Sequence, residues 1–190
     1  MGDWSGIIIC GKSTVNSADG TSQYESGVLG ANVATYGGGT NPVLNDNSGE
    51  LTYARIEFAG NAIQTDKEIN GLTLCAVGSE TKIHHIQVSY GGDDAFEFFG
   101  GTVNATHLIA YRSTDDDFDF DQGYSGKIQY GISIKDPIIS DGAELHAVLN
   151  WKIRLLWQII CIRNPYCQIS LLLVLEPKEM KNTVPRYTLD

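Results

Sequence analysis

Short runs in which apolar and polar residues alternate recur over the first 142 residues of the chain. Their two-residue period is that of a β-strand, and Gly, Asp, Asn or Ser follow most of them as turn formers. The runs cover residues 4–11, 51–60, 69–74, 83–88, 95–98, 107–111, 118–120 and 128–134. No run with the period of a helix lies between them, so the pattern predicts an all-β protein built from many short strands.

Two of these runs belong to an acidic stretch that occurs twice, at residues 91–101 and 113–123. The offset, from Phe96 to Phe118, is 22 residues, and the match extends upstream to His85 and His107. The superposed pairs are Asp93 with Asp115, Asp94 with Asp116, Phe96 with Phe118, Glu97 with Asp119, and Phe98 with Phe120. A β-sandwich does not require such similarity at a fixed offset. A parallel β-helix does, because each coil stacks its residues on the equivalent residues of the next coil.

The repeat predicts ladders of like residues inside a solenoid whose coils lie ~4.8 Å apart. Among them, Ile86 stacks on Leu108. A step of 30 residues places Ile56 on Ile86, and we attribute its extra length to an eight-residue insertion in the turn at 61–68. Residues 12–48 show little apolar periodicity and much Ser, Asn, Gly and Thr. We expect them to form a long excursion on the surface.

The alternation stops after Gly142. Residues 1–142 contain all 21 glycines, and residues 143–190 contain none. Lys152 and Arg154 interrupt the apolar residues of this tail, so no transmembrane span is predicted. Three interpretations remain open: an amphipathic helical cap on the solenoid end, an interface or membrane-surface segment, or a sequence unrelated to the fold, such as a frameshift product. The predicted organisation is a parallel β-helix fragment over 1–142 and a non-homologous tail over 143–190.

The net charge of −10 and the isoelectric point of about 4.7 argue against a nucleic-acid partner, which would need clustered Lys and Arg. They are compatible with cation binding. Cys10 and Cys75 lie in apolar strand-like runs, which indicates buried free thiols. The N-terminal residues lack a basic segment followed by an apolar one, so no signal peptide is predicted in this sequence.

Residues 4–142 resemble a group of secreted or surface-anchored, lipoprotein-type proteins of Bacteroidetes-type bacteria. The residues that carry the resemblance are 4–9, 46–51, 55–58, 68–74, 87–90 and the doubled acidic stretch through Gly126. The resemblance implies a right-handed parallel β-helix of the pectate-lyase-like kind, exported to the outer-membrane surface or secreted, and no established activity. The sequence departs from that group at both ends, where a signal segment, early coils and later coils are expected.

If the phenylalanines of the acidic stretch point inward, the alternation of the strand directs Glu97, Asp117, Asp119 and Asp121 outward. Glu97 and Asp119 then stack as like charges ~5 Å apart, which is unfavourable. Three explanations fit this arrangement: a cation lies between the carboxylates, one of them is protonated with a raised pKa, or water at the surface screens them.

The acidic stretch therefore has three possible roles. It can be a solvated acidic face whose aspartates form turns. It can be a calcium site, because hard cations prefer six to eight oxygen ligands; the candidate ligands are Asp93, Asp94, Glu97, Asp115, Asp116 and Asp119. The third role is polysaccharide cleavage by an inverting glycosidase or a lyase, with catalytic candidates Asp93, Asp94, Asp115 and Asp116. The motif resembles that of polygalacturonase-type glycosidases, but their downstream Gly-His-Gly and Arg-Ile-Lys elements are absent.

Four tyrosines suggest an aromatic stripe that stacks on sugars, and the alternative is a packed or half-buried role. The candidate ligand-binding residues are Tyr90, Tyr111 and Arg112, and the aromatic stripe extends to Tyr124 and Tyr130. For His84, His85 and His107 the register favours a structural ladder over a transition-metal site. We expect a surface-exposed or secreted β-helix module that serves a structural role or binds an extracellular glycan, stabilised by calcium; the alternative is the polysaccharide-degrading enzyme.

Overall fold

The computed structural model describes residues 1–24, 34–61, 69–136, 153–156 and 172–175. Its strands are β1 (Ile7–Cys10), β2 (Ser22–Gln23), β3 (Thr35–Tyr36), β4 (Glu50–Glu57), β5 (Leu72–Cys75), β6 (Lys82–Ser89), β7 (Phe96–Phe99), β8 (Asn104–Tyr111), β9 (Phe118–Asp121), β10 (Lys127–Ile134), β11 (Ile153–Leu156) and β12 (Leu172–Leu175). The strand runs expected from the sequence are all present between residues 7 and 134.

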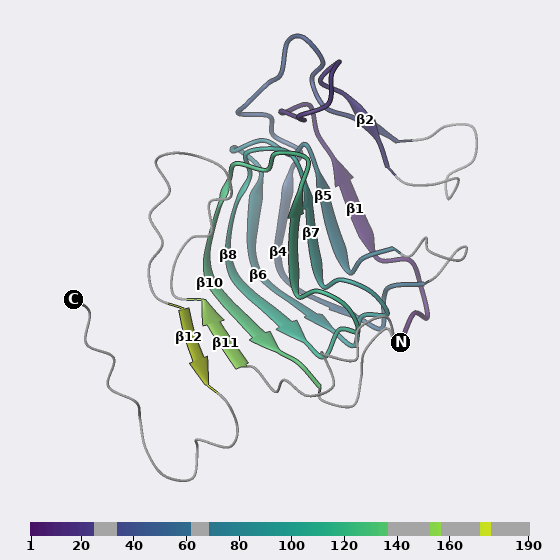
Figure 1. The fold of residues 1–190 in the computed structure, drawn as a ribbon, viewed down its shortest axis with the longest axis vertical. Helices are drawn as coiled ribbons and strands as arrows, with labels where there is room; N and C mark the ends of the chain where they lie inside the picture. The colour runs from purple at the N-terminus through teal and green to yellow at the C-terminus, as the bar shows by residue number, and fades with distance from the viewer. Residues whose placement is uncertain (25–33, 62–68, 137–152, 157–171, 176–190) are drawn as a thin grey trace, which may run out of the picture.

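Two parallel sheets form the body of the molecule. The short strands lie in the order β1-β5-β7-β9, and the long strands β4, β6, β8 and β10 lie side by side in the second sheet. Each coil runs from one short strand to one long strand and then steps to the next coil, as Figure 1 shows. The structure confirms the prediction of an all-β parallel β-helix.

The register confirms the 22-residue repeat. Phe96 pairs with Phe118, Phe98 with Phe120, and Ile86 with Leu108. The predicted pairing of Ile56 with Ile86 is wrong, because Ile56 pairs with Val88 and Ala54 with Ile86.

The physical reason for this error is that two turns of the same coil are lengthened. The turn between β4 and β5 spans residues 58–71, whereas its equivalent between β6 and β7 spans residues 90–95. The turn between β5 and β6 is also longer than the next one, with residues 76–81 against residues 100–103. The first difference is the expected eight-residue insertion, and the second adds two residues to the step.

Each long strand bends at one residue that has a positive φ. These residues are Tyr53, His85, His107 and Tyr130, with φ between 51° and 62°. They are left out of the strand pairing, while their neighbours on both sides are paired. A left-handed conformation costs a non-glycine residue roughly 1–2 kcal/mol. Its recurrence at equivalent positions in four coils shows that this bend is the corner of the solenoid.

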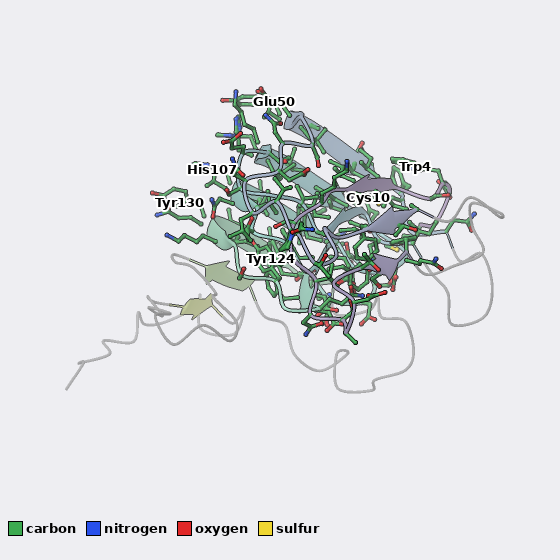
Figure 2. All side chains as sticks on the ribbon, turned by 90° about the horizontal axis from the view of Figure 1, so that it is seen from above. Trp4, Cys10, Glu50, His107, Tyr124 and Tyr130 are labelled. Atoms are coloured by element: carbon green, nitrogen blue, oxygen red, sulfur yellow. The ribbon has the colours of Figure 1, made fainter. Side chains whose placement is uncertain are left out.

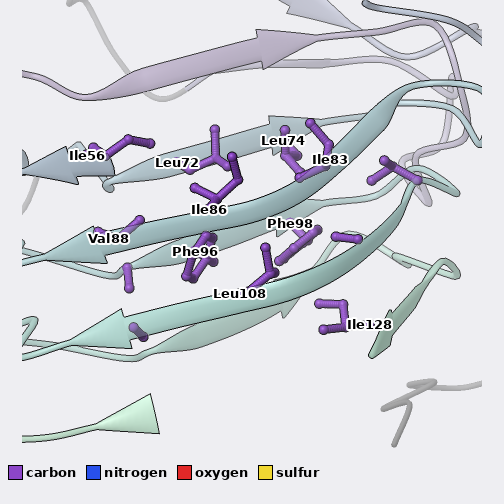
Figure 3. Packing of buried hydrophobic residues seen from close by; sticks show 14 of the residues in the cluster. Ile56, Leu72, Leu74, Ile83, Ile86, Val88, Phe96, Phe98, Leu108 and Ile128 are labelled. Atoms are coloured by element: carbon purple, nitrogen blue, oxygen red, sulfur yellow. The ribbon is translucent and has the colours of Figure 1, made fainter. Parts of the chain in front are cut away.

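The core lies between the two sheets and consists of ladders of like residues (Figure 3). Phe96 stacks on Phe118 with ring centroids 5.1 Å apart, and Phe98 stacks on Phe120 at 5.2 Å. Tyr124 is 3% exposed, packs against Phe98, and donates a hydrogen bond to the Val103 carbonyl over 2.8 Å. Because parallel coils repeat the same apolar positions, burial continues from coil to coil.

A second apolar cluster lies on the other face of the short-strand sheet. Tyr24 and Tyr36, which come from the β2–β3 region, are 3% and 2% exposed, and both pack against Phe99. The described parts of residues 12–48 lie largely at the surface, as expected, but their buried side chains also pack on this sheet. Residues 12–24 and 34–48 supply a cover for this sheet, and the rest of the segment lies outside the described residues. We call the described parts the cover segment.

In the tail, β11 pairs antiparallel with β10, and β12 pairs antiparallel with β11. These eight residues form strands, whereas one open interpretation of the tail expected a helix there. The other residues of 137–190 lie outside the described part of the chain, as do Cys161 and Cys167. Where the structure is described, it contains no helix with the length and apolar character needed to cross a membrane.

Candidate functional site: a carboxylate cluster under the cover segment

A concentration of acidic side chains lies at the covered face of the short-strand sheet. Phe96 and Phe98 point into the core, so Glu97 between them points to the opposite face. Thr73, Glu97 and Asp119 form one ladder across β5, β7 and β9. Glu97 is only 4% exposed, because the cover segment lies above this face.

Two overlapping groups of carboxylates meet here. Asp93, Asp94 and Asp115 each offer an oxygen within 4.8 Å of the others, and so do Asp94, Glu97 and Asp119. Asp94 belongs to both groups, so five carboxylates form one continuous cluster. We call these five residues the carboxylate cluster. The turns between the sheets supply the first three aspartates, and the two ladder strands supply Glu97 and Asp119.

Hydrogen bonding leaves part of this cluster unsatisfied. The Asp116 backbone N–H donates to Asp94 Oδ1 over 2.7 Å, and the Asn70 side-chain amide donates to Glu97 Oε2 over 3.2 Å. Glu97 Oε1 and Asn70 Oδ1 are buried and accept no hydrogen bond within the described structure. Glu97 faces the carboxylates of Asp94 and Asp119, which can hydrogen-bond to it only when one of them carries a proton.

Burial and mutual repulsion raise the pKa values of the two central carboxyls. Desolvation and then the neighbouring Asp119 and Asp94 charges raise the pKa of Glu97 to about 10. Desolvation and then Asp93 and Asp115 raise the pKa of Asp94 to about 8. Without a cation, both carboxyls therefore favour their protonated, neutral form. Burial raises the pKa of the Tyr24 hydroxyl, and the Glu97 and Asp93 carboxyls raise it further. The hydroxyl therefore lies close to the carboxylate cluster.

The structure corrects the expected exposure of two acidic residues and confirms that of a third. Glu97 is buried, so water does not screen its repulsion from Asp119. Asp117 is also buried, at 7% exposure, because it lies just before β9; it forms an ion pair with Lys135 and accepts a hydrogen bond from Ser133. Asp121 is exposed, as expected.

The candidate residues divide between the cluster and its surroundings. Five of the six expected calcium ligands lie in the carboxylate cluster, and the sixth, Asp116, is exposed and contributes its backbone N–H instead. Of the four catalytic candidates, Asp93, Asp94 and Asp115 offer oxygens closer than the ~6.5–9.5 Å at which an inverting pair admits a water molecule. A catalytic pairing that uses Asp116 stays a prediction.

The expected ligand-binding residues come together elsewhere, where the long strands end. Tyr90 stacks on Phe58 with ring centroids 5.3 Å apart and meets Tyr111 edge to face at 5.4 Å. The Arg112 guanidinium lies 5.0 Å from the centre of the Tyr111 ring and forms an ion pair with Asp136. Tyr124 is not part of any surface stripe, because it is buried in the core.

A groove along the bends of the long strands forms a second candidate site, of about 540 Å³. One wall is a stack of four rings, in which His85 lies 4.5 Å from Tyr53 and 4.3 Å from His107, and Tyr130 lies 4.7 Å from His107. The residues two positions further along each strand also line it: Arg55, Gln87, Ile109 and Ile132. In Figure 2 His107 and Tyr130 project from one side of the molecule, away from Cys10. The expected histidine ladder is confirmed for His85 and His107.

Sequence reasoning missed Asn70, Tyr24 and Tyr53. Asn70 precedes β5 in a turn lengthened by the insertion, and Tyr24 lies in a segment without periodicity. Tyr53 could have been found, because it occupies the position of His85 once the register is corrected by two residues.

Comparison with known proteins agrees with this architecture. No curated protein and no solved structure matches the chain significantly. The sequence profile of the family described as "Pectate-lyase like beta helix domain" matches residues 1–151. Together with the stacked parallel coils, this match shows that the chain belongs to the family of pectate-lyase-like β-helix domains.

Proposed function

We propose that this protein is a non-catalytic β-helix binding module, working outside the cell, that holds a divalent cation in the carboxylate cluster. The observation that carries the proposal is the environment of Glu97, a residue that is only 4% exposed. Its carboxyl group faces those of Asp94 and Asp119, and its Oε1 atom accepts no hydrogen bond from the residues that the structure describes. A cation removes the repulsion and supplies the missing partner at the same time. Carboxylate oxygens, with an amide oxygen at Asn70, are ligands that calcium prefers.

The number and arrangement of oxygens favour calcium over smaller ions. Magnesium demands near-ideal octahedral geometry and keeps several waters, whereas calcium accepts six to eight ligands in flexible arrangements. The cluster offers oxygens from two turns and two strands, and its members do not come from one preformed loop. Extracellular calcium modules of modest affinity have Kd values of about 10⁻⁴–10⁻³ M, and we expect an affinity in this range.

Calorimetric titration of calcium into the purified chain tests the proposal. We expect one binding event for the native protein and none for Glu97→Gln, because an amide cannot supply the negative oxygen. Glu80→Gln is the matched control, since Glu80 is exposed and its oxygen accepts a hydrogen bond from Asn45 that glutamine retains. The absence of calcium binding by the native chain, or equal binding by Glu97→Gln, would contradict the proposal.

Calcium affinity should rise with pH. Metal ligands must lose their protons, and the pKa values of about 8 for Asp94 and about 10 for Glu97 mean that both hold protons at pH 7. Binding at pH 7 therefore releases protons, and the measured enthalpy should vary with the ionisation enthalpy of the buffer. The prediction is contradicted if the binding enthalpy is the same in all buffers and the affinity is constant from roughly pH 6 to pH 9, a range that brackets the Asp94 pKa. That result would show that the ligands are already ionised before calcium binds.

The groove beside the ring stack supports carbohydrate binding as a second function of the same module. Stacked rings cover one another's faces and leave edges that carry hydroxyl and imidazole nitrogen atoms, while Ile109 and Ile132 supply an apolar surface. Repetition in each coil suits a chain-like ligand that lies along the solenoid. Tyr53, which is 76% exposed at the end of the stack, leaves one ring face free for a sugar.

Replacing Tyr53 by alanine should weaken binding of such a glycan about tenfold, equivalent to ~1.4 kcal/mol. The measurement is a glycan array followed by titration of the best ligand. Phe58→Ala is the control, because Phe58 is also exposed but lies in the separate Tyr90–Tyr111–Arg112 region. If Phe58→Ala loses affinity and Tyr53→Ala does not, the glycan binds at the ends of the long strands and not in the groove.

A further inference from the structure

Two of the four cysteines face each other across adjacent strands. Cys10 ends β1, Cys75 ends β5, and the two residues are direct partners in the parallel register. Neighbouring strands place partner Cα atoms about 4.7–4.9 Å apart, which lies within the 4.4–6.8 Å range of disulfide-linked residues. Both side chains belong to the apolar cluster on the covered face of the sheet. Both are free thiols in this structure.

The environment gives the two sulfur atoms different roles. A hydrogen bond from Cys75 lowers the pKa of Cys10, and Cys10 is partly exposed. Cys75 is fully buried, and its contact with Cys10, followed by desolvation, raises its pKa. Cys10 is thus the thiol that an external disulfide can reach, and Cys75 lies beside it as the thiol that can complete the reaction.

We propose that Cys10 and Cys75 are a redox-active pair that forms a cross-strand disulfide by exchange with an external disulfide such as oxidised glutathione. The Cys10 thiolate attacks one sulfur of the external disulfide, forms a mixed disulfide and releases one thiol. The Cys75 sulfur attacks the Cys10 sulfur and breaks the mixed disulfide, and the Cys75 proton passes to the departing thiolate, which leaves as the second thiol. The two cysteines are oxidised by two electrons in total, and the external disulfide is reduced to two thiols.

The position of the bond gives it a structural consequence. β1 is the edge strand of its sheet, and its neighbour in that sheet is β5. In the sequence, the cover segment, β4 and the turn at 58–71 separate these two strands. The cover segment begins two residues after Cys10, and the intervening Gly11 N–H donates to the Cys75 carbonyl over 2.8 Å. A disulfide therefore fixes the edge strand and the start of the cover segment to the body of the solenoid.

The test uses the full chain with Cys161→Ser and Cys167→Ser, so that Cys10 and Cys75 are the remaining thiols. The folded, reduced protein is treated with oxidised glutathione, blocked with N-ethylmaleimide and analysed by intact mass and peptide mapping. We expect loss of two hydrogens, no maleimide adduct, and a linked pair of peptides containing Cys10 and Cys75. The melting temperature should rise on oxidation and return when dithiothreitol is added.

Cys75→Ser in the same background is the matched variant. It should stop at the mixed disulfide with glutathione on Cys10 and show no reversible rise in melting temperature. The proposal is overturned if the native pair keeps two alkylatable thiols after oxidation, if Cys10 carries glutathione without forming the linked peptide, or if the link forms only after the protein is denatured.

Discussion

Replacing Phe98 by alanine should lower the free energy of unfolding by about 3–5 kcal/mol, the typical cost of truncating a buried phenylalanine. Phe98 is 1% exposed, and its ring packs 5.2 Å from Phe120 and 4.8 Å from Tyr124. The substitution removes one member of a ladder that spans coils, so the cavity adjoins residues of the next coil as well. Urea unfolding followed by circular dichroism measures the change.

Phe58→Ala is the control for this prediction, because it removes the same side chain from a position that is 42% exposed. It should cost less than about 1 kcal/mol, since its main contact is a stack with Tyr90 at the surface. Equal destabilisation by the two substitutions would mean that the phenylalanine ladder is not the main apolar contact between the coils.

Glu97→Gln should stabilise the cation-free protein at neutral pH by about 1–3 kcal/mol, the range for a buried polar group left without a partner. The amide N–H groups of glutamine can donate to oxygens of Asp94 and Asp119, and glutamine needs no bound proton to be neutral in the folded state. In the native protein the pKa of Glu97 is about 10, against about 4.3 in an unfolded chain. The folded state therefore holds a proton between these pH values that the unfolded state has lost.

The sign of the pH dependence follows from this difference. When the folded state binds more protons, the free energy of unfolding falls as the pH rises. Glu97 therefore lowers the free energy of unfolding progressively as the pH rises from about 4.3 to about 10. Glu97→Gln should remove this contribution to the pH dependence of stability. Thermal unfolding measured from roughly pH 5 to pH 9, which lies within this range, checks the prediction. The control Glu80→Gln should show the same pH dependence as the native chain. Identical slopes for Glu97→Gln and the native protein would place the residue in water.

The fold was predictable because its determinant is local and repeated. The acidic stretch and its phenylalanines occur twice at one offset, and parallel coils are the arrangement that places such copies in register. The register failed only at Ile56, where turns of unequal length separate the coils. A repeat seen twice cannot fix the length of turns in a coil that has no second copy.

The acidic residues of the candidate site were predictable from the sequence, but their environment was not. The alternation of the strand places Glu97 opposite the phenylalanines, and this orientation is correct. Its burial depends on Tyr24 and the rest of the cover segment, which packs on the sheet without a periodic pattern of its own. The covered face is thus a contact between segments distant in sequence, and that contact changes Glu97 from a solvated acid into a buried one.

The bends of the long strands were beyond sequence reasoning for another reason. Tyr, His, His and Tyr have no shared preference for a left-handed conformation, yet Tyr53, His85, His107 and Tyr130 all adopt it. The corner of the coil imposes the conformation, and the groove beside the rings follows from it.

The most direct test of the cation site is a crystal structure of the chain grown with calcium, using the anomalous signal to identify the ion. We expect one calcium ion bound by oxygens of Asp94, Glu97 and Asp119 at about 2.3–2.6 Å, beneath Tyr24. A structure with no ion at this position, in which Glu97 is instead hydrogen-bonded to the Asp94 carboxyl through a shared proton, would contradict it.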